Sequence, residues 1–195
     1  NLNIGVSTSV GIGGDPINGS SFRDIIEKFE TDSFILSVTE KGLIKKTDVM
    51  AYANVRSSGI IGLKLDHQDS LVRCALCREG EDVLLVTKQG KSIRFAESGV
   101  RQVGRAARGV VGIRFSEDED RVIGLEVIPP NSESTILSVC ENGFGKRTPQ
   151  VEYRQQSRGG KGIYTIKVTS RNGPVVGISQ VDSGDHLMLM TSSGK

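Results

Sequence analysis

The chain has 195 residues, 36% of them hydrophobic, and a formal net charge of +2, which by itself is too small to indicate a nucleic-acid ligand. No apolar run approaches the 18 residues that a membrane-spanning helix needs, and the N-terminus lacks a secretory signal pattern. The three cysteines have no disulfide spacing, so we expect a protein of the reducing cytoplasm with no membrane partner.

Residues 1–31 follow a different pattern from the rest of the chain. Residues 2–12 predict a strand that enters a glycine-rich turn, and the apolar residues between Phe22 and Phe29 have the spacing of one helix face. The sequence VSTSVGIGGDPINGSSF resembles a segment of the succinyl-CoA ligase α subunit. This resemblance implies a grafted or fused strand–loop–helix segment, as in a chimera. Residual nucleotide or CoA binding by its glycine loop is one alternative function.

From residue 33 onward the sequence repeats with a period near 50. The turn glycines Gly42, Gly90, Gly143 and Gly194 are 48, 53 and 51 residues apart, and each of the first three is followed by a basic strand. Alternating hydrophobicity predicts four strands in each repeat, which is typical of the blades of a propeller. We therefore expect an all-β, incomplete disc with blades at about 33–80, 81–130 and 131–184 and a partial blade at 185–195. The third strand of each blade is predicted at 59–65, 110–115 and 163–168.

Four phrases, GIIGLKL, RGVVGIRF, ENGFGKRTP and SRGGKGI, are specific enough to indicate a family. Residues 33–195 resemble the DNA gyrase A C-terminal domain and, more loosely, the equivalent domain of topoisomerase IV. Members of this family fold as a β-pinwheel that exchanges a strand between neighbouring blades, and they bind and bend duplex DNA around a basic rim. The family's Q-R-R-G-G-K-G box is matched most closely by residues 156–162, where Ser157 replaces an arginine.

The resemblance implies a non-catalytic module of a bacterial type IIA topoisomerase that binds duplex DNA without sequence preference. Its partners would be DNA and the remaining gyrase subunits, with no cofactor. Binding to phosphates requires basic side chains spread over a surface, and the corner glycines would let the backbone approach closely. The candidate DNA-binding residues are Lys45, Lys46, Arg56, Lys91, Arg94, Arg105, Arg108, Lys146, Arg147, Arg158, Gly159, Gly160, Lys161 and Gly162.

Two other interpretations remain open at this point. The same disc could serve as a scaffold for protein interactions, and its open strand edges could let chains associate.

The CxxC formed by Cys74 and Cys77 lacks the second ligand pair that zinc requires, so both are expected to be strand residues. None of the three tyrosines lies in a DNA-cleavage motif, and Tyr52 and Tyr153 occupy matching positions that suggest packing.

Overall fold

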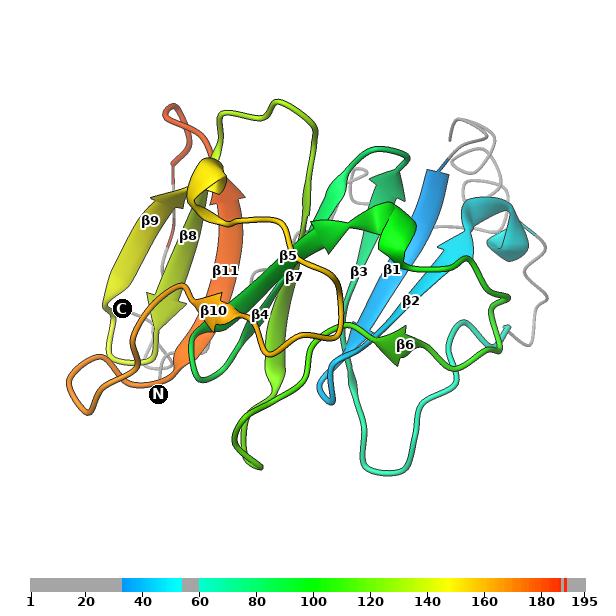
Figure 1. The fold of residues 1–195 in the computed structure, drawn as a ribbon, viewed down its shortest axis with the longest axis horizontal. Helices are drawn as coiled ribbons and strands as arrows, with labels where there is room; N and C mark the ends of the chain where they lie inside the picture. Colours follow the sequence, from blue (N-terminus) through cyan, green and yellow to red (C-terminus); the bar gives the residue numbers. More distant parts are fainter. Residues whose placement is uncertain (1–32, 54–59, 187, 189–195) are drawn as a thin grey trace.

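The computed structural model describes residues 33–53, 60–186 and 188, which form three β-sheets lying side by side (Figure 1). The described residues contain no α-helix, only three 3-10 turns: η1 (Val49–Tyr52), η2 (Glu97–Gly99) and η3 (Gln150–Glu152). The all-β prediction is therefore confirmed for this part of the chain. The strand and helix predicted within residues 1–31, and most of the partial blade predicted at 185–195, lie outside the described residues.

Each sheet is built on an antiparallel hairpin whose tip carries one of the turn glycines. The first sheet has the order β3-β1-β2-β6, the second β10-β5-β4-β7, and the third β11-β8-β9. The strands of the first sheet are β1 (Ser33–Thr39), β2 (Leu43–Asp48), β3 (Leu71–Arg78) and β6 (Val110–Val111). Those of the second are β4 (Asp82–Thr87), β5 (Lys91–Ala96), β7 (Val122–Ile128) and β10 (Ile163–Tyr164). Those of the third are β8 (Thr135–Cys140), β9 (Gly145–Pro149) and β11 (Val175–Val181).

Two strands are exchanged between neighbouring repeats. β6 comes from the second repeat but pairs with β2, and β10 comes from the third repeat but pairs with β5. The assignment of 110–115 to the second blade and of 163–168 to the third is therefore wrong, although the exchange itself is what the family resemblance implied. Residues 60–65 form no strand, because no sheet that precedes the first one is present among the described residues. The third sheet has three strands in the described chain, not the predicted four, because residues 163–164 of its repeat pair with β5 of the second sheet and no described segment takes that place beside β9.

The turn glycines make this exchange possible. Gly42 and Gly90 have φ values of +80° and +76°, and their carbonyl oxygens accept hydrogen bonds from Gly112 (2.8 Å) and Thr165 (2.9 Å) of the incoming segments. A Cβ atom at Gly90 would lie 2.1 Å from the carbonyl oxygen of Ile166. Glycine is therefore needed both for the backbone conformation and for the close approach of the exchanged segment.

The core consists of two clusters of buried side chains, one from the first and second sheets and the other from the second and third. Leu84 and Leu85 are both fully buried although they are adjacent, because successive side chains of β4 point to opposite faces of the middle sheet. Leu85 belongs to the same core cluster as Leu36 of the first sheet, whereas Leu84 belongs to the cluster that contains Ile136 of the third. The middle sheet thus fixes the positions of its neighbours and of the segments that run along the rim.

Candidate nucleic-acid interface

The charges of this protein are segregated along the chain. We define the two corner segments as residues 101–115 and 154–168, which contain the loops before β6 and β10 and those strands. Together they hold eight basic residues and no acidic one, whereas the rest of the chain holds 17 basic and 23 acidic residues. The basic residues are Arg101, Arg105, Arg108, Arg114, Arg154, Arg158, Lys161 and Lys167. The small net charge therefore conceals two strongly positive segments.

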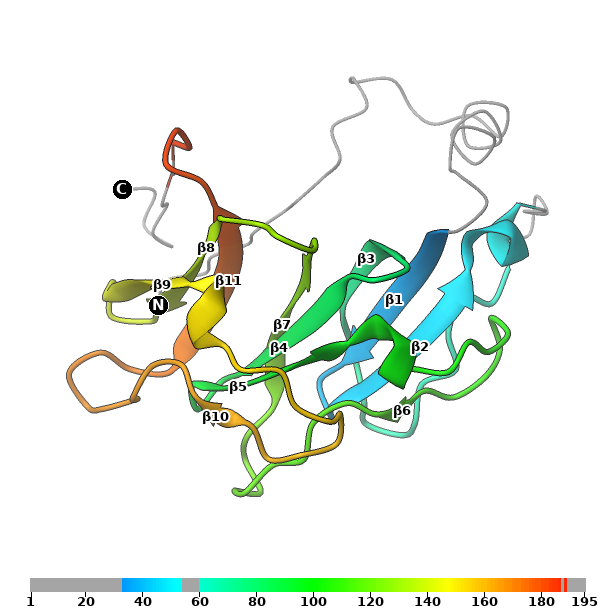
Figure 2. The same ribbon diagram turned by 45° about the horizontal axis from the view of Figure 1, so that its top comes forward.

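The two corner segments are held in the same way on neighbouring sheets. The backbone N–H of Val103 donates to the carbonyl of Lys46 at 2.9 Å, and that of Gln156 donates to the carbonyl of Arg94 at 2.7 Å. Each segment then continues into the exchanged strand at the edge of the preceding sheet, as Figure 2 shows for β6 and β10. Equivalent basic residues therefore recur at equivalent places on the first and second sheets.

Four basic side chains in the corner segments form two equivalent, exposed pairs. Arg101 and Arg154 are 53 residues apart, as are Arg108 and Lys161, and all four are exposed. Arg108 is ion-paired with Asp66. Sequence reasoning identified Arg108 and Lys161 but missed Arg101 and Arg154. The signal that could have found them is the repeated Arg-Gln dipeptide at the same 53-residue offset.

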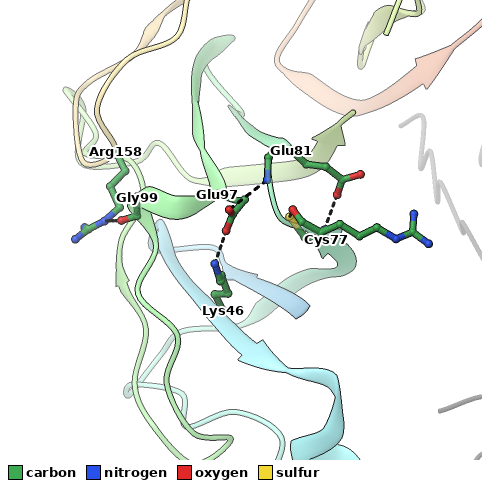
Figure 3. Close-up of polar contacts among 8 residues, drawn as sticks. Lys46, Cys77, Glu81, Glu97, Gly99 and Arg158 are labelled. Carbon is green, nitrogen blue, oxygen red and sulfur yellow. Dashed lines mark hydrogen bonds and ion pairs between the residues drawn. The ribbon is translucent and has the colours of Figure 1, made fainter. Parts of the chain in front are cut away.

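Arg105 and Arg158 have a structural role in addition to their charge. Nη1 of Arg105 donates to the carbonyl of Ile61, and Nη1 of Arg158 donates to the carbonyl of Val111, both at 2.9 Å. Ile61 and Val111 occupy equivalent positions, so each arginine fastens its corner segment to the corresponding part of the preceding repeat. Nε of Arg158 also donates to the carbonyl of Gly99 at 2.7 Å (Figure 3). DNA contact by these two arginines stays a prediction.

Lys45 and Lys46 are buried and do not lie on an exposed rim, which argues against DNA contact by these two residues; their assignment as DNA-binding residues stays a prediction. Lys45 is 1% exposed, its Nζ donates to the carbonyl of Gly62 at 2.6 Å and to that of Arg105, and burial lowers its pKa. Lys46 is 8% exposed and forms an ion pair with Glu97 of η2 (Figure 3). The physical reason is the second repeat, which covers β2 with its corner segment and η2.

Arg94 also makes contacts that link the second repeat to the third. Its Nε is 2.7 Å from a carboxylate oxygen of Asp82, and its Nη1 donates to the carbonyl of Gln150 in the third repeat at 2.9 Å. Arg147 has the equivalent place in the third sheet and is exposed, as is Lys146, because no further sheet covers β9 in the described chain. The predicted residue Arg56 lies outside the described residues.

The glycines of the box-like corner are required by packing. Gly162 has a φ of +69°, and a Cβ there would lie 2.4 Å from the carbonyl oxygen of Ser92 on β5. Gly159 has a φ of +76°, and its N–H donates to the carbonyl of Gly112 at 2.6 Å. These contacts explain both glycines without a ligand. Gly160 approaches Ile93, with 3.4 Å between its hypothetical Cβ and that side chain.

The remaining sequence motifs have structural roles. Cys77 is buried, which raises the pKa of its thiol to about 12, whereas Cys74 is exposed. The described residues contain no group of three potential metal ligands. The Tyr153 hydroxyl lies 2.6 Å from that of Thr165, and the Tyr52 hydroxyl donates to the carbonyl of Gly62. Both tyrosines therefore stabilise loop positions. Across the described ranges, no helix has the length and apolar character needed to cross a bilayer.

Comparison with known proteins identifies the fold and the family. The family model "DNA gyrase C-terminal domain, beta-propeller" matches residues 33–78, 81–129 and 135–182. The chain is 41% identical over 166 residues to the gyrase A protein of Haloquadratum walsbyi, and 41% identical over 169 residues to that of Salmonella typhimurium. These matches cover 85% and 87% of the chain but only 19% of each relative.

Two solved structures have the same architecture. The C-terminal domain of DNA topoisomerase IV superposes with a TM-score of 0.73 at 26% identity, covering 80% of this chain and 48% of that one. The DNA gyrase A C-terminal domain superposes with a TM-score of 0.70 at 25% identity, covering 80% and 51%. The family match begins at residue 33, and no comparison supports the resemblance of residues 1–31 to succinyl-CoA ligase. Since the matched residues make up well over half of the sequence, the chain belongs to the family of DNA gyrase C-terminal β-propeller domains.

Proposed function

We propose that this protein is a non-catalytic accessory module of a type IIA topoisomerase that binds duplex DNA without sequence preference and bends it. The observation that carries the proposal is the pair of corner segments, which present eight basic and no acidic residues at equivalent edges of neighbouring sheets. The kinship with gyrase A proteins supports the same function. Its partners would then be DNA and the other parts of a gyrase, in the cytoplasm.

The arrangement suits a ligand that is a continuous line of phosphates. Contacts to phosphates carry no sequence information, and they position the protein along the duplex. The corner segments lie on successive sheets of a disc, so a duplex that follows both must curve with the rim. Smooth bending of a short duplex costs a few kcal/mol, which the additional phosphate contacts would have to offset.

The test is a salt titration of a fluorescent duplex with a variant that removes one exposed charge from each corner segment. Arg101→Ala/Arg154→Ala changes equivalent residues that are exposed on both segments. The logarithm of affinity falls with the logarithm of salt by about 0.9 for each phosphate neutralised, so this slope should become flatter by roughly two units. All duplex sequences should be weakened alike.

A charge-matched control distinguishes the rim from net charge. Arg78 lies on β3 and Arg121 directly precedes β7, and these strands are at the opposite edges of their sheets from β6 and β10. Arg78→Ala/Arg121→Ala should leave the slope unchanged. If both double variants bind like the wild type, or if the wild type shows almost no salt dependence, the DNA proposal fails. A protein-interaction scaffold would then be the better description.

A further inference from the structure

One exchanged strand carries an aromatic side chain that its counterpart lacks. Tyr164 of β10 pairs in register with Lys91 and is 61% exposed. At the equivalent place in the first sheet, Val111 pairs with Leu43. The two exchanged strands are otherwise held alike, so the tyrosine and the lysine are not needed to form the strand pair.

The side chains around Tyr164 make a small polar site. Nζ of Lys91 lies 5.3 Å from the centre of the Tyr164 ring, and it donates to the hydroxyl of Ser116 at 2.8 Å, which fixes it there. A surface hollow of about 410 Å³ adjoins the ring. It is lined by Gln89, Glu117, Tyr164, Lys167 and Val168. The site thus combines an exposed aromatic face with an amide, a carboxylate and two ammonium groups.

We propose that Tyr164 is a stacking platform for an unpaired nucleobase of DNA. Every base has a π-face that can stack on an aromatic side chain, and cationic groups beside such a platform contact the backbone. Lys91 and Lys167 would serve the flanking phosphates, and Gln89 and Glu117 offer an amide and a carboxylate to the edge of the base. An exposed ring alone would carry no such meaning, but Lys91 and Lys167 lie beside this one, and its own segment, 154–168, holds no acidic residue, although Glu117 of the neighbouring repeat also lines the hollow.

This inference rests on the proposed function, because it adds a second kind of contact to the same basic rim. It differs from that function in its ligand. The bases of an intact duplex are stacked on each other and cannot offer a face to Tyr164, whereas a single-stranded or gapped segment can. The site therefore predicts a contribution that appears only with unpaired DNA.

The experiment compares Tyr164→Val with the wild type on a single-stranded oligothymidylate and on a mixed-sequence duplex of equal length, at one salt concentration. Valine is the residue at the equivalent position of β6, so the variant reproduces a strand that the fold already contains. Affinity for the single strand should fall roughly tenfold, as for loss of one stacked base, and duplex affinity should change less than twofold. Tyr164→Phe keeps the ring and should bind both ligands like the wild type.

Three results would overturn the inference. Unchanged single-strand affinity in Tyr164→Val, with duplex binding intact, would reject the platform and leave the proposed function standing. Equal weakening on both DNAs would make Tyr164 an ordinary part of the duplex rim. Absence of any DNA binding by the wild type would reject the proposed function and this inference together. A urea-unfolding midpoint equal to that of the wild type confirms that Tyr164→Val is folded.

Discussion

The ion pair between Lys46 and Glu97 provides a direct test of whether a basic residue beside a turn glycine serves DNA or the fold. The two side chains are only 10% and 5% exposed, and the ammonium group also lies 4.2 Å from the centre of the Phe34 ring. Lys46→Met keeps most of the length of the side chain and removes its charge, so the Glu97 carboxylate is left buried without its cation. Breaking a buried pair from one side costs about 3–5 kcal/mol, whereas an exposed pair contributes about 0–1 kcal/mol. The free energy of unfolding should therefore fall by about 3–5 kcal/mol.

Urea unfolding followed by circular dichroism measures this loss, and the chain contains its own control. Arg147 occupies the equivalent register position on β9 but is exposed, so Arg147→Met should change the free energy of unfolding by less than about 1 kcal/mol. The double variant Lys46→Met/Glu97→Gln removes both charges and should recover most of the stability, because an uncompensated buried charge is what destabilises the single variant. Duplex affinity of folded Lys46→Met should stay within about twofold of the wild type, since the side chain is covered.

The opposite pattern would refute the reasoning. If Lys46→Met unfolds with a free energy within about 1 kcal/mol of the wild type, the pair does not hold the two sheets together. If that variant also binds duplex DNA more weakly, with a salt slope flatter by about one unit, Lys46 contacts phosphate as its sequence position first suggested.

Two further predictions concern the turn glycines and the cysteines. Gly143→Ala should lower the free energy of unfolding by about 1–2 kcal/mol, the cost of a left-handed conformation, because no described atom lies within 4 Å of its Cβ position. Gly90→Ala should lower the free energy of unfolding further, because its Cβ would also collide with the backbone carbonyl of Ile166. Urea unfolding measures both losses, and equal losses for the two variants would contradict the packing argument. In the native protein at pH 8, iodoacetamide should modify exposed Cys74 quickly and Cys77 hardly at all. A pKa of about 12 leaves roughly one Cys77 thiol in 10,000 ionised at that pH, and mass spectrometry of the labelled peptides would show fast labelling of Cys77 if this reasoning fails.

Much of the fold could be predicted because it repeats. Period-2 alternation in segments such as 83–87 and a hairpin glycine at each repeat are local signals, and they predicted the hairpins correctly. The destination of the exchanged strands could not be predicted from alternation, because residues 110–115 alternate in the same way whichever sheet receives them. The sheet that receives this segment is determined by a contact between residues distant in sequence, the hydrogen bond from the Gly112 N–H to the Gly42 carbonyl.

The candidate site was only partly predictable, for a related reason. Lys46 and Arg147 have the same place in their repeats and similar charge, yet one is buried and the other exposed. What separates them is the neighbouring sheet: η2 of the second repeat supplies Glu97 to Lys46, and no described element covers Arg147. A residue's position within one repeat therefore does not determine its exposure, which depends on the next repeat.

The box-like corner shows why arginine and lysine are not equivalent on this rim. Arg158 uses two of the five N–H donors of its guanidinium group on the carbonyls of Gly99 and Val111, so the planar group can fasten two backbone segments and still present donors and charge outward. Lys161 has a single ammonium group and is exposed, which suits a contact that follows a line of phosphates without fixed geometry. The same short motif therefore joins consecutive repeats through Arg158 and faces solvent through Lys161. A change of sequence at the corner would alter the stability of the disc and its charge through different residues.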